Sequence, residues 1–274
     1  MTTPSRPQPP PSRPQASPGK ISFAEVSQRK GHRILLYGTG GIGKTTLACL
    51  AQGKTVFVDA DESLPVLKSQ LKALEIENPQ VVSVSSWSTL RAALNSPGWD
   101  GVSNIVLDTI TKIEEWSLAH VLSTVKTDKG RTAEGIEDYG FGKGYKYAFE
   151  NFLLLLGDLE RHTRAGRNVF LIAHDCTSNV PNPKGEDYLR YEPRLQHAGK
   201  GDASVRLRLK EWCDHVLFLG YDVEVNKATG VAEGHGSRTL YASELPFCMA
   251  KSRTFSGTIN IDKPGDSPWE LILK

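Results

Sequence analysis

Short apolar runs and longer segments of helical spacing follow one another along most of the chain. A run of four to eight apolar residues bounded by turn formers is typical of a buried strand. Five segments fit this description and predict strands: 33–37 (RILLY), 55–59 (TVFVD), 81–85 (VVSVS), 104–108 (NIVLD) and 168–175 (NVFLIAHD).

Helical patterns fill the intervals between these runs. The predicted helices span 44–52, a segment near 87–95, and 145–166, where Gly166 is placed as a C-terminal stop. Alternation of strand and helix predicts an α/β fold with a mostly parallel central sheet flanked by helices. In such a sheet ligands bind at the carboxyl ends of the strands.

The character of the chain changes after the last of these strands. Residues 176–203 are polar and rich in turn formers, which predicts a long loop. A helix over 204–214 and a strand over 215–225 follow. The turn formers at 226–230 and the run at 237–242 predict a C-terminal antiparallel hairpin.

Composition separates the two ends of the chain. Residues 1–19 are dominated by Pro, Ser, Gln and Arg and predict a disordered tail, which leaves 20–274 as a single domain. No apolar run approaches the roughly 20 residues of a membrane span, and the N-terminus lacks a secretory signal. We therefore expect a cytoplasmic protein without a membrane partner.

Charge and cysteine content narrow the candidate chemistry only a little. The formal charge of +2 favours no class of partner, so a nucleic-acid binder would have to concentrate its basic residues locally. The four cysteines are scattered without a C-x-x-C pair, which argues against a zinc site or a disulfide framework.

The segment 38–45 (GTGGIGKT) matches the phosphate-binding pattern G-x-x-x-x-G-K-[ST]. Glycines let successive backbone N–H groups face one anion, and the following helix adds its positive end. Lys44 is expected to reach the β and γ phosphates, and the Thr45 hydroxyl to bind Mg²⁺. The predicted ATP-binding residues are Gly38, Thr39, Gly40, Gly41, Ile42, Gly43, Lys44, Thr45 and Thr46.

Carboxylates at strand ends supply the remaining chemistry. Asp108 ends an apolar strand and is the expected metal-side residue, although it is also placed to cap the next helix. Asp61 is favoured over Glu62 as the group that activates water, with solvated loop charges as the alternative. Asp59 is expected to be structural. His174, at the end of a later strand, is a candidate sensor of the γ-phosphate.

In this order, these features resemble the RecA-like branch of P-loop ATPases. Asp61 stands where that branch keeps a catalytic Glu, a departure that leaves Glu62 open as the acting residue. More narrowly, the chain resembles the phage-encoded minimal RecA-like ATPases, which include the single-strand annealing proteins of phage recombination modules. The segments that carry this resemblance are LLYGTGGIGKTTLA, DYGFGKGYKYAFENFLLLLGDL, VFLIAHD, LKEWCDHVLF and AKSRTF.

The resemblance implies two further sites. Lys251 and Arg253 match the position of cations that act on a neighbouring subunit's phosphates, which implies a homo-oligomer, a ring or a filament. The alternative is two exposed cations. The segment after the sensor strand implies single-stranded DNA binding by Arg190, Arg194, Lys200 and Arg206, with Tyr188 and Tyr191 stacking on bases.

That segment carries a surplus of basic residues. Between 188 and 210, six basic residues face two acidic ones, and Gly199 and Gly201 flank Lys200. The alternative is a solvated basic loop beside a helix. The function that the sequence favours is a Mg²⁺-dependent ATPase acting on single-stranded DNA in phage recombination, in a bacterial host's cytoplasm and with a possible single-strand DNA-binding protein as partner. Its competitors are a nucleotide-dependent switch that binds proteins and a small-molecule kinase.

Overall fold

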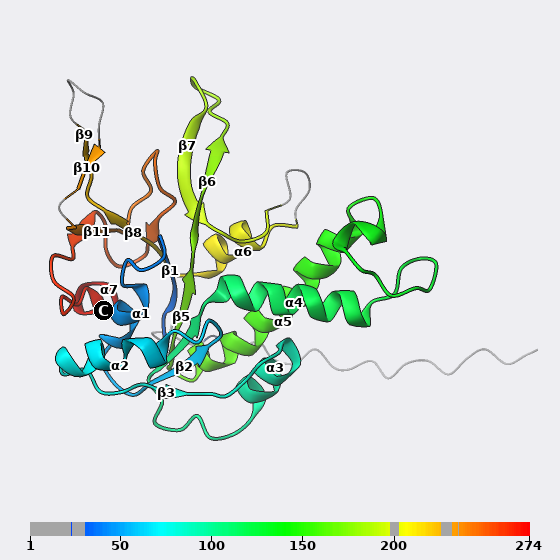
Figure 1. Ribbon diagram of the computed structural model, residues 1–274, viewed down its shortest axis with the longest axis horizontal. Coiled ribbons are helices and arrows are strands. Elements are labelled where there is room, and N and C mark those ends of the chain that lie inside the picture. Colours follow the sequence, from blue (N-terminus) through cyan, green and yellow to red (C-terminus); the bar gives the residue numbers. More distant parts are fainter. Residues whose placement is uncertain (1–22, 24–30, 198–202, 226–231, 235) are drawn as a thin grey trace, which may run out of the picture.

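A mostly parallel sheet forms the centre of the protein (Figure 1). The computed structural model describes residues 23, 31–197, 203–225, 232–234 and 236–274. Within them the sheet runs β13-β11-β8-β1-β5-β4-β2-β3, with β12 paired to β8. The parallel strands are β1 (Arg33–Tyr37), β2 (Thr55–Asp59), β3 (Gln80–Val81), β4 (Asn104–Asp108), β5 (Asn168–Ala173) and β8 (His215–Tyr221). The predicted α/β fold is confirmed.

Three antiparallel strands complete the sheet beyond β8. They are β11 (Arg238–Tyr241), β12 (Lys251–Ser252) and β13 (Thr258–Asn260). The pairing of β8 with β11 confirms the predicted antiparallel arrangement, while the turn 226–230 and the N-terminal tail 1–19 lie outside the described residues. Two short strands, β9 (Glu224–Val225) and β10 (Ala232–Glu233), pair separately.

Helices cover both faces of the sheet. One apolar cluster packs α3 (Trp87–Asn95), α4 (Ile110–Thr124), α5 (Lys143–Arg164) and α6 (Val205–Trp212) on one face. The other packs α1 (Lys44–Cys49), α2 (Leu64–Ala73) and α7 (Trp269–Ile272) on the opposite face. In β1, Leu35 and Tyr37 join the first cluster and Ile34 and Leu36 the second. Burial on both faces explains the unbroken apolar run of this strand.

Helix α5 shows how sequence fixes a local boundary. Its buried stripe includes Phe152, Leu155, Leu156 and Leu159, at the spacing of one helix face. The helix ends before Gly166, whose φ of 92° is the left-handed conformation that glycine adopts without steric cost. The predicted stop is therefore confirmed.

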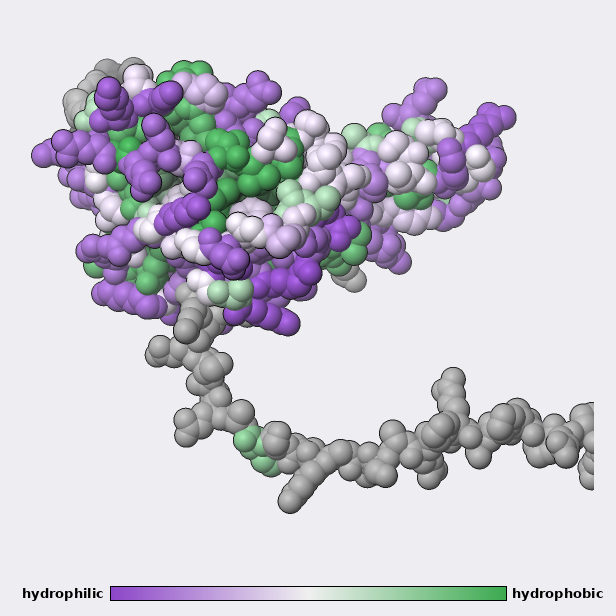
Figure 2. Space-filling model, turned by 90° about the horizontal axis from the view of Figure 1, so that it is seen from below, coloured by the Kyte–Doolittle hydropathy of each residue, from purple (hydrophilic) through white to green (hydrophobic). Residues whose placement is uncertain are grey.

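The far ends of α4 and α5 form an arm that projects from the body (Figure 1). The short helix η1 (Ile136–Tyr139) lies in the connection, and the Tyr139 hydroxyl donates to the Val121 and Val125 carbonyls. Seen from below, hydrophobic residues gather on the body, whereas the arm shows mainly hydrophilic and neutral ones (Figure 2). No helix in the described ranges is long and apolar enough to cross a membrane.

Two predicted elements were wrong in extent. The expected loop after β5 contains an antiparallel hairpin, β6 (Asp175–Val180) and β7 (Tyr188–Pro193), which stands out from the sheet (Figure 1). The turn formers at 181–187 led to the prediction of a loop. The two flanking strands were missed because their pairing depends on contacts across the turn. The strand expected over 81–85 is shorter than predicted, because only Gln80–Val81 pairs with β2 at the edge of the sheet.

Candidate active site

The phosphate loop connects the end of β1 to the start of α1. Two of its glycines are required, one by a close backbone contact and one by its backbone conformation. A Cβ at Gly38 would lie 2.2 Å from the Leu219 carbonyl oxygen of β8. Gly43 has φ 104°, and a Cβ there would lie 2.6 Å from Nη1 of Arg238. The backbone contact excludes a side chain at Gly38, whereas at Gly43 the left-handed conformation disfavours one, since the arginine side chain could move aside.

Lys44 lies beneath this loop as a buried cation. Its Nζ donates to the Gly38 and Thr39 carbonyl oxygens at 2.7 and 2.8 Å. Burial lowers the pKa of Lys44 to about 8, against the opposing effect of Asp108. Among the described residues, the hydrogen bonds of this ammonium group go to backbone carbonyls alone. Such a buried cation strongly attracts a phosphate oxygen.

Thr45 and Asp108 meet across the site. The Thr45 hydroxyl donates to Oδ2 of Asp108 at 2.6 Å, and the Asp108 side chain is buried at the end of β4. Burial raises the pKa of Asp108 to about 6, and the Thr45 hydrogen bond opposes this shift. Asp108 is not the cap of α4, because Thr109 occupies that position and accepts from the Lys112 N–H at 3.1 Å.

These two oxygen-bearing side chains fit a magnesium ion. Hard divalent cations take oxygen ligands, and Mg²⁺ keeps several waters and phosphate oxygens in its shell. The described residues contain no group of three or more His, Cys, Asp or Glu able to hold a metal alone. An ion held by Thr45 and Asp108 would therefore depend on a bound polyphosphate.

The acidic segment after β2 divides into structural and open carboxylates. Asp59 accepts from the Ser63 and Leu64 N–H groups at 2.9 Å each, so it fixes the start of α2 as expected. Asp61 lies 3.6 Å from Nε2 of His174, measured from its Oδ2. Glu62 lines the same cavity and has a left-handed φ of 54°. Sequence order alone did not reveal the contact between Asp61 and His174.

His174 joins the site to the hairpin. Burial, reinforced by Lys44 and Arg194, lowers its pKa below the ordinary value. Its backbone N–H donates to the Thr111 hydroxyl at 3.1 Å, and its carbonyl accepts from the Arg194 N–H at 2.8 Å. The neutral imidazole thus sits where β5, α4 and the root of the β6–β7 hairpin meet.

One cavity of about 720 Å³ contains the loop residues 40–46, Asp61, Glu62, Asp108 and His174. Residues 30–254, most of the chain, match the family model of an AAA domain (AAA_24). The chain belongs to this AAA domain family. The search among curated proteins found no match. The protein is therefore a nucleotide-binding P-loop ATPase domain, and the cavity is its candidate nucleotide site.

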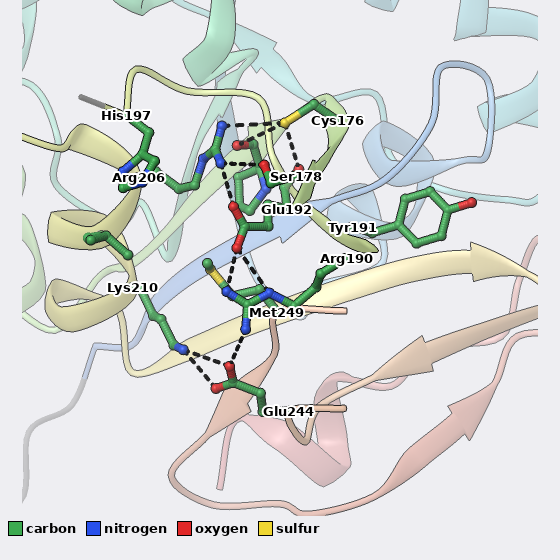
Figure 3. A network of polar contacts seen from close by, with 12 residues as sticks. Cys176, Ser178, Arg190, Tyr191, Glu192, His197, Arg206, Lys210, Glu244 and Met249 are labelled. Atoms are coloured by element: carbon green, nitrogen blue, oxygen red, sulfur yellow. Dashed lines mark hydrogen bonds and ion pairs between the residues drawn. The ribbon is translucent and has the colours of Figure 1, made fainter. Parts of the chain in front are cut away.

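Two of the residues of this AAA domain that were predicted to bind DNA form ion pairs within the protein (Figure 3). Arg190 and Arg206 both pair with the buried Glu192, and Arg190 also pairs with Glu244 at 2.8 Å. Burial alone would raise the pKa of Glu192, but the two guanidinium groups outweigh it and hold that pKa below its usual value. These ion pairs satisfy much of the charge of Arg190 and Arg206 within the protein, and DNA contact by either arginine stays a prediction.

The rest of the basic segment is also largely compensated. Lys210 pairs with Glu244 at 2.7 Å and Arg208 with Glu211 at 3.5 Å. Arg194 is exposed at the root of the hairpin. Lys200, with the glycines on either side of it, lies outside the described residues.

Lys251 and Arg253 lie near the amino-terminal ends of the parallel strands, at the opposite end from the phosphate loop. Lys251 pairs with Val216 near the start of β8, whereas the phosphate loop follows the end of β1. The Lys251 ammonium donates to the Lys210 carbonyl at 2.5 Å, at the end of α6, and burial lowers its pKa. The Arg253 side chain is 63% exposed and lies 3.4 Å from Asp214. Neither cation is placed to act on its own phosphate loop.

Proposed function

We propose that this AAA domain is a Mg²⁺-dependent ATPase that acts on single-stranded DNA in phage recombination, promoting annealing or strand pairing. One observation carries the proposal. The first strand of the hairpin begins at the residue after His174. Nε2 of His174 lies 3.6 Å from Oδ2 of Asp61 in the cavity of the phosphate loop. A site for the γ-phosphate and a projecting element thus share one residue.

The residues divide the work of hydrolysis. Lys44 would neutralise charge on the β and γ phosphates, and Thr45 and Asp108 would hold Mg²⁺, which supplies further positive charge where the phosphates are cleaved. Asp61 is the favoured residue for orienting the attacking water, because its carboxylate is open to the cavity. Glu62 is the alternative from the same segment.

His174 would report the state of the phosphates. A neutral imidazole can donate one hydrogen bond and accept another, so a new partner at Nε2 would compete with Asp61. Because both roots of the hairpin are tied to His174, through the Asp175 peptide and the Arg194 N–H, a rotation there would tilt the hairpin. ATP turnover would thereby alter how the hairpin holds its ligand.

The residues that remain available at the hairpin support a DNA ligand. Tyr191 is 41% exposed and its ring stacks on Phe218 with centroids 5.1 Å apart. Arg194 adds an exposed cation beside His174. An aromatic ring with a nearby cation is the usual means of holding single-stranded nucleic acid without sequence preference. Lys200 belongs to the same proposal from sequence alone.

Oligomers form part of the proposal. Lys251 and Arg253 lie at the opposite end of the parallel strands from their own phosphate loop. A role at the phosphates therefore requires a second subunit. Arg253 is the better candidate, since Lys251 is bound to the end of α6. A ring or a filament formed on DNA, with a single-strand DNA-binding protein nearby, would supply that neighbour.

The test is ATP hydrolysis with and without single-stranded DNA, together with oligonucleotide binding across a salt series. We expect DNA to raise turnover and affinity to fall as salt rises, because phosphate contacts release counterions. Arg194→Ala should weaken DNA binding, while the matched variant Arg208→Ala should change it little. Equal turnover with and without DNA, and no salt-dependent binding, would exclude the DNA role.

A second function is favoured by the compensated charges. The hairpin tip carries Lys184 against Glu186 and Asp187, and Leu189 is 68% exposed. Such a surface suits a protein partner better than a polyanion. A nucleotide-dependent switch would hydrolyse ATP in the same cavity, and its hairpin would bind protein without responding to DNA.

A further inference from the structure

The cavity of the phosphate loop extends beyond what a triphosphate requires. Its volume is about 720 Å³, in the range of sites that enclose a whole small molecule. Its further lining comes from two sources. Val66, Leu67 and Gln70 belong to α2, and Tyr221, Arg238, Asp262 and Pro264 come from the C-terminal antiparallel part of the sheet and the segment that follows it.

Strand order shows in which direction a nucleotide would extend. Asp108 ends β4, which lies on one side of β1 in the sheet, whereas β8 and β11 lie on the other side. The metal-side carboxylate therefore marks the end of the cavity where the terminal phosphates bind. The nucleoside would extend across the loop toward Tyr221 and Arg238.

Backbone pairing brings the C-terminal residues of the cavity together. Arg238 lies directly opposite Tyr221 in the antiparallel pair of β8 and β11. The Arg238 carbonyl accepts from the Ile261 N–H at 2.7 Å, which places Asp262 immediately beside it. Arg238 also donates from Nη1 to the Ile42 carbonyl of the phosphate loop at 2.8 Å. The guanidinium group is thus fixed between the loop and the strands.

The Tyr221 ring has exposed surface on which a base could stack. Tyr221 is 47% exposed at the end of β8. Aromatic rings and guanidinium planes stack on nucleobases.

We infer that these residues form a slot for an adenine base, with Tyr221 and Arg238 against the ring and the Asp262 carboxylate accepting from its exocyclic amino group. The inference rests on the proposed function, because it places the base of the same ATP molecule. A carboxylate beside this edge rejects a base that carries a carbonyl oxygen there, since two acceptors repel each other. The slot therefore selects ATP over inosine triphosphate.

The experiment measures the binding of three probes to the full chain by calorimetry: ATP, inosine triphosphate and inorganic tripolyphosphate. We expect ATP to bind about tenfold more tightly than inosine triphosphate, and Asp262→Asn to abolish most of that difference. Tyr221→Ala should weaken ATP about tenfold and Tyr221→Phe much less. Tripolyphosphate binding should be unchanged in all three variants.

The controls separate the slot from the phosphate site. Asp100→Asn, which removes an exposed carboxylate outside the cavity, should preserve the preference for ATP. Equal binding of ATP and inosine triphosphate by the unaltered protein would overturn the base slot, as would an unchanged preference in Asp262→Asn. If neither ATP nor tripolyphosphate binds the unaltered protein, the proposed ATPase function itself fails.

Discussion

Two regions of this AAA domain use the same charged residue types in opposite ways. At the phosphate loop, Lys44 is buried and donates to two backbone carbonyls, and Asp61 faces an open cavity. At the root of the hairpin, Arg190 and Arg206 close on Glu192, and Lys210 on Glu244 (Figure 3). Charges left without a full partner mark a binding site, whereas charges that neutralise one another mark a joint between elements.

The largest expected effect is at the phosphate loop. Lys44→Ala should lower ATP hydrolysis about 1,000-fold, because it removes the cation aimed at the phosphates. Thermal unfolding should stay cooperative, since the ammonium bonds only its own loop. Phosphate release and circular dichroism melting measure both. Lys54→Ala removes an exposed lysine and is the matched control. Hydrolysis retained in Lys44→Ala would contradict the site.

A substitution in the ion-pair cluster of Arg190, Glu192 and Arg206 should lower the stability of the protein. Glu192→Gln leaves two buried guanidinium groups without their shared carboxylate, which should lower the free energy of unfolding by about 3 kcal/mol. Urea denaturation measures this loss. Glu186→Gln, at the exposed hairpin tip, should change it by less than about 0.5 kcal/mol. Equal losses of unfolding free energy in both variants would show that the ion pairs of Glu192 do not stabilise the protein.

The two acidic candidates after β2 can be separated by turnover. Asp61→Asn should lower kcat about 100-fold while ATP affinity stays nearly constant, because the carboxylate acts on water. Glu62→Gln should have the smaller effect. Single-turnover hydrolysis and nucleotide binding give the two quantities. The reverse ranking would assign the role to Glu62.

The smallest predicted effect concerns Glu114 on α4, whose contribution to stability depends on pH. Burial raises the pKa of Glu114 on α4 to about 7, although both carboxylate oxygens accept from the Gln196 N–H beyond the hairpin. The folded protein then holds a proton that the unfolded chain releases near pH 4.3, so stability is present at low pH and is lost as pH rises toward 7.

Glu114→Gln should remove that dependence. We expect the variant to gain on the order of 2 kcal/mol relative to the unaltered protein between pH 5 and pH 8. Urea denaturation at both values measures the difference. An identical pH profile for the two proteins would mean that Glu114 is ionised in the folded state. Glu150→Gln, which removes an exposed carboxylate on α5, should leave the profile unchanged.

The features that sequence predicted are local in the chain. The phosphate loop, α3 and the end of α5 follow from residues within a few positions of one another, such as Ser86 with Thr89 in the cap of α3. The hairpin was missed because its strands are polar and pair across a turn. The ion pairs of Arg190 and Arg206 with Glu192 were not predicted, because a count of charges does not reveal the carboxylate that each one meets. Arg238 and Asp262 reach the cavity only through strand pairing.

Tyr37 is the last residue of β1 before the phosphate loop begins. Its buried hydroxyl group donates to the Tyr191 and Met249 carbonyls at 2.9 and 2.7 Å. The step from Tyr37 to Gly38 is thus anchored on one side by the root of the hairpin and on the other by the segment leading to Lys251. A displacement of the loop by a few tenths of an ångström would be transmitted through one phenol oxygen to both, without passing through His174.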